Sequence, residues 1–520
     1  MSLLKNFATV GGATMASRLL GFARDTLLAA AVGTGPVADA FVVAFRLPNL
    51  FRRLFAEGAF NSAFVPLFGR AVEEEGEEGA RRFAGEIAAG LLFCLLIVTA
   101  VAEIFMPMVV WGLAPGFVGD PDKFDLTVLM SRIAFPYLIF MSLLAFISGI
   151  LNTYQRFAAA ALAPVMLNVV MTIVLGGVLY FDIVQERQLA IVLSVGVTLA
   201  GLVQLFVVIG DMKRLGFRIP VFRPRFTPST KRLLALGVPG VVAGGVTQIN
   251  VAVGQVIASM QDGANALLYY ADRLYQLPLG VIGVAIGVVL LPSLTRQLRG
   301  GHEDQYQRSL NNALEFSLTL TLPAAIALAV VPREIVSVLF ERGQFDAVAT
   351  DGTAAALAAF AFGLPAFVLN KVFSPGYFAR EDTKTPMIFA SVGMVVNVAL
   401  SLALFPFLAH VGIALATTVS GWLNTGLLIF VLWQRGHFKP DRRILKKVAL
   451  ILLSSIIMGL AVEGLSMVLE PWMADGNLAI RAGALALLVL AGMFVFAAAV
   501  QITGGTDLLA HIKALKRRNT

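Results

Sequence analysis

Apolar runs of about twenty residues or more recur along the whole chain, separated by short polar segments. A helix of about 20 apolar residues crosses a hydrocarbon core of about 30 Å, so each run is long enough to span a membrane. The pattern predicts spans at 8–33, 36–66, 84–113, 124–151, 159–182, 187–210, 231–258, 264–294, 307–331, 346–372, 385–405, 409–433, 444–468 and 479–502. The pattern therefore predicts an all-α polytopic membrane protein with fourteen transmembrane helices.

The composition excludes a soluble protein and several kinds of site. Of the 520 residues, 58% are hydrophobic and 14% charged, whereas an ordinary globular chain is about 45–50% apolar and about 25% charged. The single cysteine, Cys94, excludes an intramolecular disulfide and a cysteine-based metal site. The four histidines are scattered, and the sequence has no P-loop for ATP phosphates. No metal site or cofactor is expected.

The basic residues predict the orientation. With the N-terminus in the cytoplasm, 27 of the 40 Lys and Arg fall on the cytoplasmic side and six on the opposite side. This asymmetry follows the positive-inside rule, so both termini are expected to be cytoplasmic. The basic tail at 506–520 then lies beside anionic lipid headgroups, which explains the net charge of +8 better than nucleic-acid binding.

Seven basic residues lie within or close to the predicted spans. They are Arg18, Arg24, Arg46, Arg52, Arg53, Arg273 and Lys371. An ionisable group near the centre of a membrane helix costs about 2.5–3.5 kcal/mol unless it faces water or a partner. Snorkelling toward a helix end, or pairing with the embedded Asp25, Asp39 or Asp272, is the alternative to a functional role. Since six of the seven lie in the first, second and eighth spans, a shared function is favoured.

A weak internal repeat predicts the domain organisation. The segment at 44–47 is similar to the segment at 271–274, and each is followed by a Pro at comparable distance. Two six-helix lobes would explain this similarity: an N-terminal lobe at 1–222 and a C-terminal lobe at 223–440. Residues 441–505 then add two helices, and 506–520 form the tail. Such parallel repeats commonly enclose a central cavity that opens by alternating access.

The excess of arginine over aspartate in these spans indicates the substrate. A planar guanidinium suits phosphate oxygens, whereas a cationic drug would need carboxylates or aromatic cages. The residues by themselves therefore predict a transporter of an anionic, phosphate-bearing substrate. A membrane enzyme such as a polyprenyl-phosphate transferase is disfavoured, because the longest predicted loops, near 67–83, 211–230 and 434–443, are short and offer no acidic metal cluster.

Several motifs of the chain are distinctive: Ser17 to Asp25, Asp39-Ala40-Phe41, Phe45 to Leu50, Arg52-Arg53, Phe55 to Phe60, Ala114 to Phe117, Leu151-Asn152-Thr153, Tyr270 to Leu274 and Leu291 to Leu294. These motifs resemble those of the MurJ (MviN) lipid II flippases, of the multidrug/oligosaccharidyl-lipid/polysaccharide (MOP) exporter superfamily. The resemblance covers essentially the whole chain. It implies a MATE-like fold and a transporter, not an enzyme, that moves undecaprenyl-pyrophosphate-linked peptidoglycan precursor to the outer leaflet of the bacterial cytoplasmic membrane.

The resemblance also implies the site. The substrate-binding residues expected from it are Arg18, Arg24, Asp25, Asp39, Asn49, Arg52 and Arg273. The last two spans would form an apolar groove for the polyprenyl tail. Lipid II and membrane lipids are the expected partners, with the cell-wall synthesis machinery as a further candidate, no nucleic acid, and a functional monomer.

Two departures from the family leave questions open. Gln276 stands where some relatives carry a Glu. The sodium site of some relatives maps to Asn370 and Ser374, where a Ser beside Lys371 is a poorer ligand for a hard cation. Coupling to sodium, protons or the membrane potential therefore stays open. The alternative functions are export of another polyprenyl-linked oligosaccharide and MATE-like drug antiport.

Overall fold

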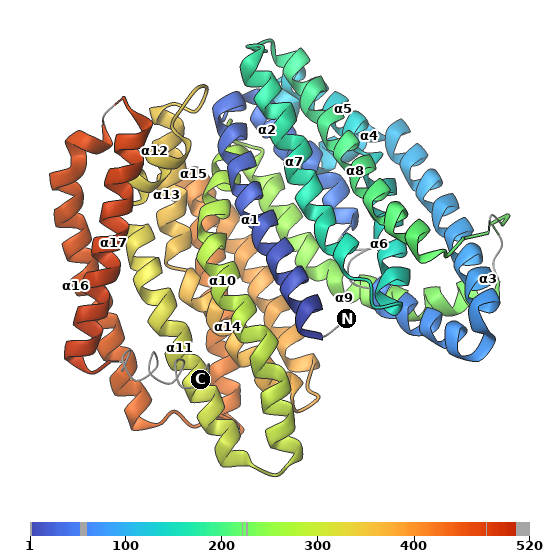
Figure 1. Cartoon of the computed structure of the whole chain (residues 1–520). Helices are drawn as coiled ribbons and strands as arrows, with labels where there is room; N and C mark the ends of the chain where they lie inside the picture. Colours follow the sequence, from blue (N-terminus) through green and yellow to red (C-terminus); the bar gives the residue numbers. More distant parts are fainter. Residues whose placement is uncertain (1–2, 53–59, 221, 225–226, 475, 506–520) are drawn as a thin grey trace. The chain divides into compact units, whose positions relative to one another are not determined.

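The computed structural model describes residues 3–52, 60–220, 222–224, 227–474 and 476–505, and within them the regular structure is entirely helical (Figure 1). The chain forms two compact units. The first comprises residues 1–266 and 343–345, and the second comprises 267–342 and 346–520. A membrane-spanning chain needs helices because lipid offers no hydrogen-bond partners, so every backbone N–H and C=O must be satisfied within the protein.

The first unit holds the helices of the N-terminal half. They are α1 (Leu3–Val32), α2 (Pro36–Arg52), α3 (Phe60–Ile104), α4 (Met106–Leu113), the short 3-10 helix η2 (Pro115–Gly119), α5 (Pro121–Ala134), α6 (Tyr137–Thr153), α7 (Ala158–Tyr180), α8 (Glu186–Leu215) and α9 (Pro228–Ala258). Several boundaries follow local chemistry. Asp120 accepts a hydrogen bond from the Lys123 backbone N–H at 3.2 Å and caps α5, which begins with Pro121.

The second unit holds the later helices. They are most of α10 (Ala264–Arg299), then α11 (Glu303–Val330), α12 (Pro332–Phe340), α13 (Ala347–Ala361), α14 (Leu364–Phe378), α15 (Lys384–Gln434), α16 (Arg442–Met473) and α17 (Leu478–Thr503). Asp346 caps α13 by accepting the Ala349 backbone N–H at 2.8 Å, and α17 ends where Gly504 adopts a positive φ of 74°.

The predicted spans fall on these helices. Within the described residues, nine helical segments are long and apolar enough to cross a membrane, and the one at 384–434 contains two predicted spans that meet at a non-helical Ala409. One prediction is wrong: the expected loop at 67–83 is helical, and α3 breaks its helical geometry only at Gly76. Glutamate and arginine pairs four residues apart, such as Glu77 with Arg81 at 2.7 Å, support helix there.

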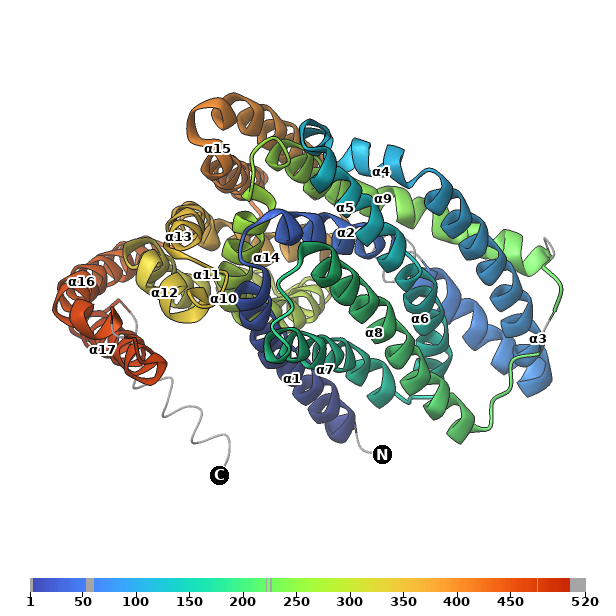
Figure 2. The same ribbon diagram turned by 90° about the horizontal axis from the view of Figure 1, so that it is seen from above.

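In the first unit, α1 packs along α7, and α2 lies against α5, as Figures 1 and 2 both show. A core shared by α2, α3, α4, α5 and α6 is formed by buried apolar residues such as Leu47, Met106 and Phe135. The end of α1 requires glycine. Gly33 has a φ of 56°, and a Cβ there would lie 2.2 Å from the Gln344 carbonyl oxygen.

In the second unit, α16 and α17 pair along their lengths (Figure 1), and α16 packs against α11. Buried Ile451, Met458, Leu488 and Val500 belong to the core of this layer. The outward faces expose large apolar side chains such as Phe494, which is 75% accessible. Such a surface suits lipid, since a soluble monomer rarely exposes a continuous apolar face.

The boundary between the units falls later than the predicted boundary between the lobes. The helix α9, which the repeat assigns to the C-terminal lobe, packs against α3 in the first compact unit. The division into lobes at 222 and 440 stays a prediction.

Candidate functional site

The first polar centre of the structure lies on α1, where two oppositely charged residues are adjacent in sequence. Arg24 is 8% and Asp25 3% accessible. The Arg24 guanidinium donates to one Asp25 carboxylate oxygen from Nη2 at 2.7 Å and from Nε at 3.1 Å. A buried guanidinium needs such a partner because an uncompensated charge is costly in a medium of low dielectric constant.

Asn168 of α7 completes this centre. Arg24 Nη1 donates to Asn168 Oδ1 at 3.0 Å, and Asn168 Nδ2 donates to the Ser17 carbonyl oxygen at 2.8 Å. A Cβ at Gly21 would lie 3.4 Å from Asn168 Nδ2, so the small residue lets the amide approach α1. Glycine here serves close helix packing, and the Asn168 amide fixes the orientation of the Arg24 guanidinium.

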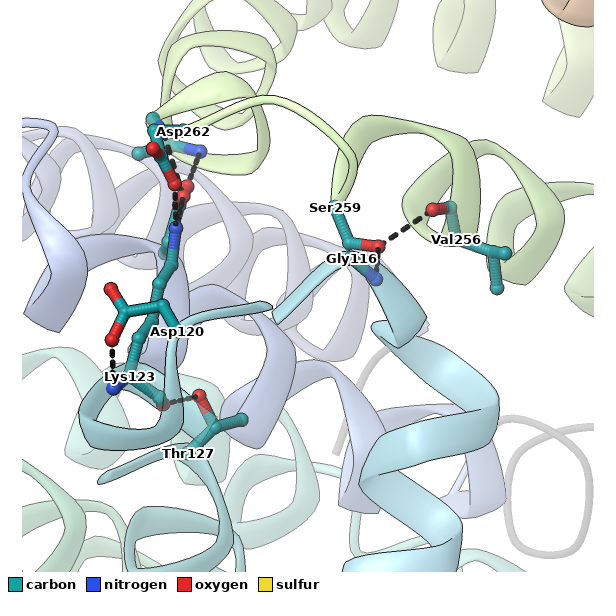
Figure 3. A network of polar contacts seen from close by, with 10 residues as sticks. Gly116, Asp120, Lys123, Thr127, Val256, Ser259 and Asp262 are labelled. Carbon is teal, nitrogen blue, oxygen red and sulfur yellow. Dashed lines mark hydrogen bonds and ion pairs between the residues drawn. The ribbon is translucent and has the colours of Figure 1, made fainter. Parts of the chain in front are cut away.

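The second polar centre joins α2, α5 and the turn between α9 and α10 (Figure 3). Asp39 is completely buried, and its carboxylate accepts the Lys123 ammonium at 2.7 Å. The same ammonium donates to Asp262 at 3.0 Å and lies 4.3 Å from the centre of the Phe117 ring. The Lys123 ammonium therefore contacts two carboxylates and an aromatic ring, and its side chain is only 2% accessible.

Asp39 also binds the beginning of α10. Its carboxylate accepts the backbone N–H of Gly263 at 2.8 Å and of Ala266 at 3.0 Å. The N-terminus of a helix carries free N–H groups and a partial positive charge, which stabilise an anion placed there. A carboxylate of α2 thus supplies the cap of α10, and the Lys123 ammonium balances its charge.

A close backbone contact lies beside this centre. The backbone N–H of Gly116 donates to Ser259 Oγ at 3.1 Å, as Figure 3 shows. A Cβ at Gly116 would lie only 2.2 Å from the Ser259 carbonyl oxygen, so η2 and the end of α9 touch through their backbones. The Ala114 to Phe117 motif singled out in the sequence is therefore a packing element of the centre that holds Asp39.

The second unit has its own polar residues on α10. Arg273 is half-buried, with its guanidinium carbon 4.7 Å from the centre of the Tyr269 ring. Asp272 accepts a hydrogen bond from Gln276, four residues later. Gln276 thus donates to a neighbouring acid. The carboxylate of Asp272 therefore has a partner on its own helix.

The residues considered for sodium lie on α14. Ser374 Oγ donates to Asn370 Oδ1 at 2.9 Å, and both side chains are half-buried. Their oxygens are neutral, and Lys371 follows Asn370 directly in the chain. In the described part of the chain, no group of three or more His, Cys, Asp or Glu side chains could hold a metal ion. Asn370 and Ser374 supply one amide and one hydroxyl oxygen, far short of the roughly six oxygen ligands that a hard cation takes, and a lysine lies beside them, so this donor set alone does not fit a resident cation.

The other predicted site residues occupy α1 and α2. Arg18 is half-buried, and so is Asn49, whose Nδ2 donates to the Phe45 carbonyl oxygen at 2.8 Å. Arg46 is half-buried on the same helix. Arg52 is the last residue of α2, and its side chain lies outside the described part, as does all of Arg53.

Two residues of the site were missed. Asp39 was considered as a partner for an embedded basic residue of the spans, whereas it binds Lys123, which lies one residue before the predicted span at 124–151. The Asp-Pro pair at 120–121 is a helix-start signal that could have placed Lys123 in the first turn of a helix. Asn168 is an uncharged residue in an apolar run, so the charge pattern did not mark its contact with Arg24.

Comparison with known proteins gives the family. Residues 28–482 match the family model described as "Lipid II flippase MurJ". The chain is 50% identical over 520 residues to a probable lipid II flippase MurJ of Rhizobium tropici, covering 100% of this chain and 97% of the relative. It is also 50% identical over 521 residues to the corresponding protein of Rhizobium meliloti, covering 99% of this chain and 97% of the relative.

Solved structures give the same answer for the fold. A lipid II flippase MurJ in an inward closed conformation is similar with a TM-score of 0.78 and 26% identity, covering 95% of this chain and 98% of that one. An inward-facing MATE-family multidrug transporter of the MOP superfamily is similar with a TM-score of 0.65 and 14% identity, covering 81% and 94%. The second likeness concerns the fold alone.

Proposed function

Since the chain belongs to the MurJ lipid II flippase family, we propose that it carries lipid II from the inner to the outer leaflet of the bacterial cytoplasmic membrane by alternating access. The observation that carries the proposal is the 50% identity to flippases over the full chain. The predicted fold class, a multi-span helical protein of the MOP type, is confirmed by the likeness to the solved flippase. Both termini would face the cytoplasm.

In this proposal, arginines bind the pyrophosphate of the substrate. Arg18, Arg24, Arg52 and Arg273 would supply guanidinium forks for its oxygens. The pairing of Arg24 with Asp25 and Asn168 supports an exchange of partners, because the substrate phosphate would compete with the carboxylate for the same N–H groups. Asp39 would act differently, by holding the beginning of α10 through its amide bonds.

The lipid tail and the driving force belong to the same proposal. The apolar outward surface of α16 and α17 would accommodate the polyprenyl chain beside the membrane lipids. An inside-negative membrane potential favours the outward movement of an anion by about 2.3 kcal/mol per charge per 100 mV. No step of the proposal depends on sodium, since Asn370 and Ser374 supply only two oxygens and Lys371 lies beside them.

Complementation tests the proposal. The endogenous flippase of a bacterial host is depleted, this chain is expressed, and the surface accessibility of lipid II is followed over time. Wild-type protein should restore accessibility, and Arg273→Ala should not. Arg299→Ala is the matched control, because it removes an exposed arginine from the end of the same helix.

The outcomes are separable. A folded, well-expressed wild-type chain that restores no lipid II at the surface would refute the substrate, and export of another polyprenyl-linked glycan or of a cationic drug would then be tested in vesicles. Restoration by Arg273→Ala at wild-type level would refute the role of that arginine and leave the substrate standing.

A further inference from the structure

A single accessible stripe runs along α14. Most of this helix is buried, because it packs against α11 and α15. The residues that remain accessible are Phe367, Asn370, Lys371, Ser374 and Phe378. Their spacing of three or four residues places them on one face of the helix. Three of the five are polar, although they lie within the apolar segment at 347–378.

Lys371 is the charged member of this stripe. It is exposed, and among the described residues no carboxylate forms an ion pair with its ammonium. A lysine within an apolar segment is costly unless its ammonium reaches water or an anion. The embedded Arg24 and the buried Lys123 both have acidic partners in the structure. Lys371 therefore differs from them in being available to a partner that is not part of the protein.

The stripe adjoins α10, the helix that carries the predicted substrate-binding Arg273. A Cβ at Gly283 of α10 would lie 3.6 Å from Lys371 Cγ. Further along the same pair of helices, the rings of Tyr275 and Phe367 lie 5.8 Å apart. The exposed Gln276 is seven residues before Gly283, which is two helical turns, so both lie on the same side of α10.

The positions along the helices give an order from the cytoplasm outward. Lys371 is seven residues before the end of α14 at Phe378, which corresponds to about 10 Å along the axis. Arg273 is ten residues before Gly283 on α10, or about 15 Å farther along from the level of Lys371. With the orientation proposed above, Lys371 is nearer the cytoplasm and Arg273 nearer the outside.

We propose that Lys371 is a further substrate-binding residue, which holds the pyrophosphate of the lipid substrate on the cytoplasmic side before the group reaches Arg273. This inference rests on the proposed function. The ammonium suits the role because it is a compact charge on a flexible stem, which attracts phosphate without fixing one geometry. A residue that contacts the pyrophosphate early in transport should bind it weakly, since tight bidentate binding there would retain the substrate.

Binding measurements on the full chain in lipid nanodiscs test the assignment. The probes are lipid II and undecaprenyl pyrophosphate, which carries the same pyrophosphate without sugar or peptide. Lys371→Gln should raise the Kd for both probes by about tenfold, the loss expected for one hydrogen bond to a charged group. Lys371→Arg should stay within about threefold of wild type, since the charge remains. Lys384→Gln, which removes an exposed lysine just beyond the span, should change neither Kd.

Each result decides a different question. Equal weakening for both probes supports the assignment, provided that Lys371→Gln elutes as a monodisperse protein and melts with wild type. Weakening for lipid II alone would place Lys371 on the glycopeptide and overturn the pyrophosphate contact. Unchanged binding of both probes would make Lys371 a lysine that snorkels to the lipid interface. If wild-type protein bound neither probe, the proposed function would fail together with the inference.

Discussion

The pair of Asp39 and Lys123 offers a quantitative test of how the first unit is stabilised. The two groups lie 2.7 Å apart, with side chains that are 0% and 2% accessible. At an effective dielectric constant of about 20, their attraction is on the order of 6 kcal/mol, most of which offsets the cost of removing both charges from water. The net contribution of the ion pair to the free energy of unfolding is therefore much smaller than the loss caused by removing only one of its members.

Lys123→Met is the decisive single variant. It leaves the Asp39 carboxylate buried with only two backbone amides as partners. Removing one member of a buried ion pair costs about 3–5 kcal/mol. For a unit of this size, that loss corresponds to a melting temperature roughly 6–20 °C lower. Asp262 cannot replace Lys123, because it is itself a carboxylate. Its own loss of the ammonium costs little, since its side chain is 97% accessible.

A double-mutant cycle isolates the pair. Asp39→Asn combined with Lys123→Met leaves no uncompensated buried charge, so the double variant should be about 2–3 kcal/mol more stable than the sum of the single losses implies. Thermal unfolding of purified protein in nanodiscs, followed by intrinsic fluorescence, measures each variant. Lys213→Met, which alters an exposed lysine of the same unit, should lie within about 0.5 kcal/mol of wild type. Strictly additive losses would refute the reasoning.

Two further predictions follow from other contacts. Gly116→Ala should destabilise the protein by about 1–3 kcal/mol, because its Cβ would lie 2.2 Å from a carbonyl oxygen at the end of α9. Gly119→Ala, with no heavy atom within 4 Å, should not, and equal melting temperatures for the two variants would contradict the contact. At the turn between α14 and α15, burial raises the pKa of Asp382, but hydrogen bonds from Thr385 and the Arg435 guanidinium together lower it to about 2. A lowered carboxylate pKa stabilises the fold above about pH 4, the pKa of the unfolded chain, and the gain is lost as the pH falls toward 2. Asp382→Asn should therefore lower the melting temperature by the same amount at pH 5 and at pH 8, and a difference that appears only near pH 8 would count against this origin.

The sequence by itself determined the class of protein and most of its helices. Lipid excludes unpaired backbone groups, so an apolar run of sufficient length has no alternative to a helix. The motifs of the first two spans identified the family, which the full-length relatives confirm. The sequence also marked Arg24 and Asp39 as unusual, because a charge in an apolar segment stands out without any structure.

Only the tertiary structure decided which charges meet. Lys123 and Asp39 are 84 residues apart in the chain, and Arg24 and Asn168 are 144 apart. Such contacts depend on which helices pack together and with what rotation, and the apolar pattern of a membrane helix specifies neither, because it is hydrophobic on nearly all sides. The predicted spans leave Lys123 just outside the span at 124–151, since an apolar pattern cannot detect that an acid of α2 lies close enough to bury its ammonium.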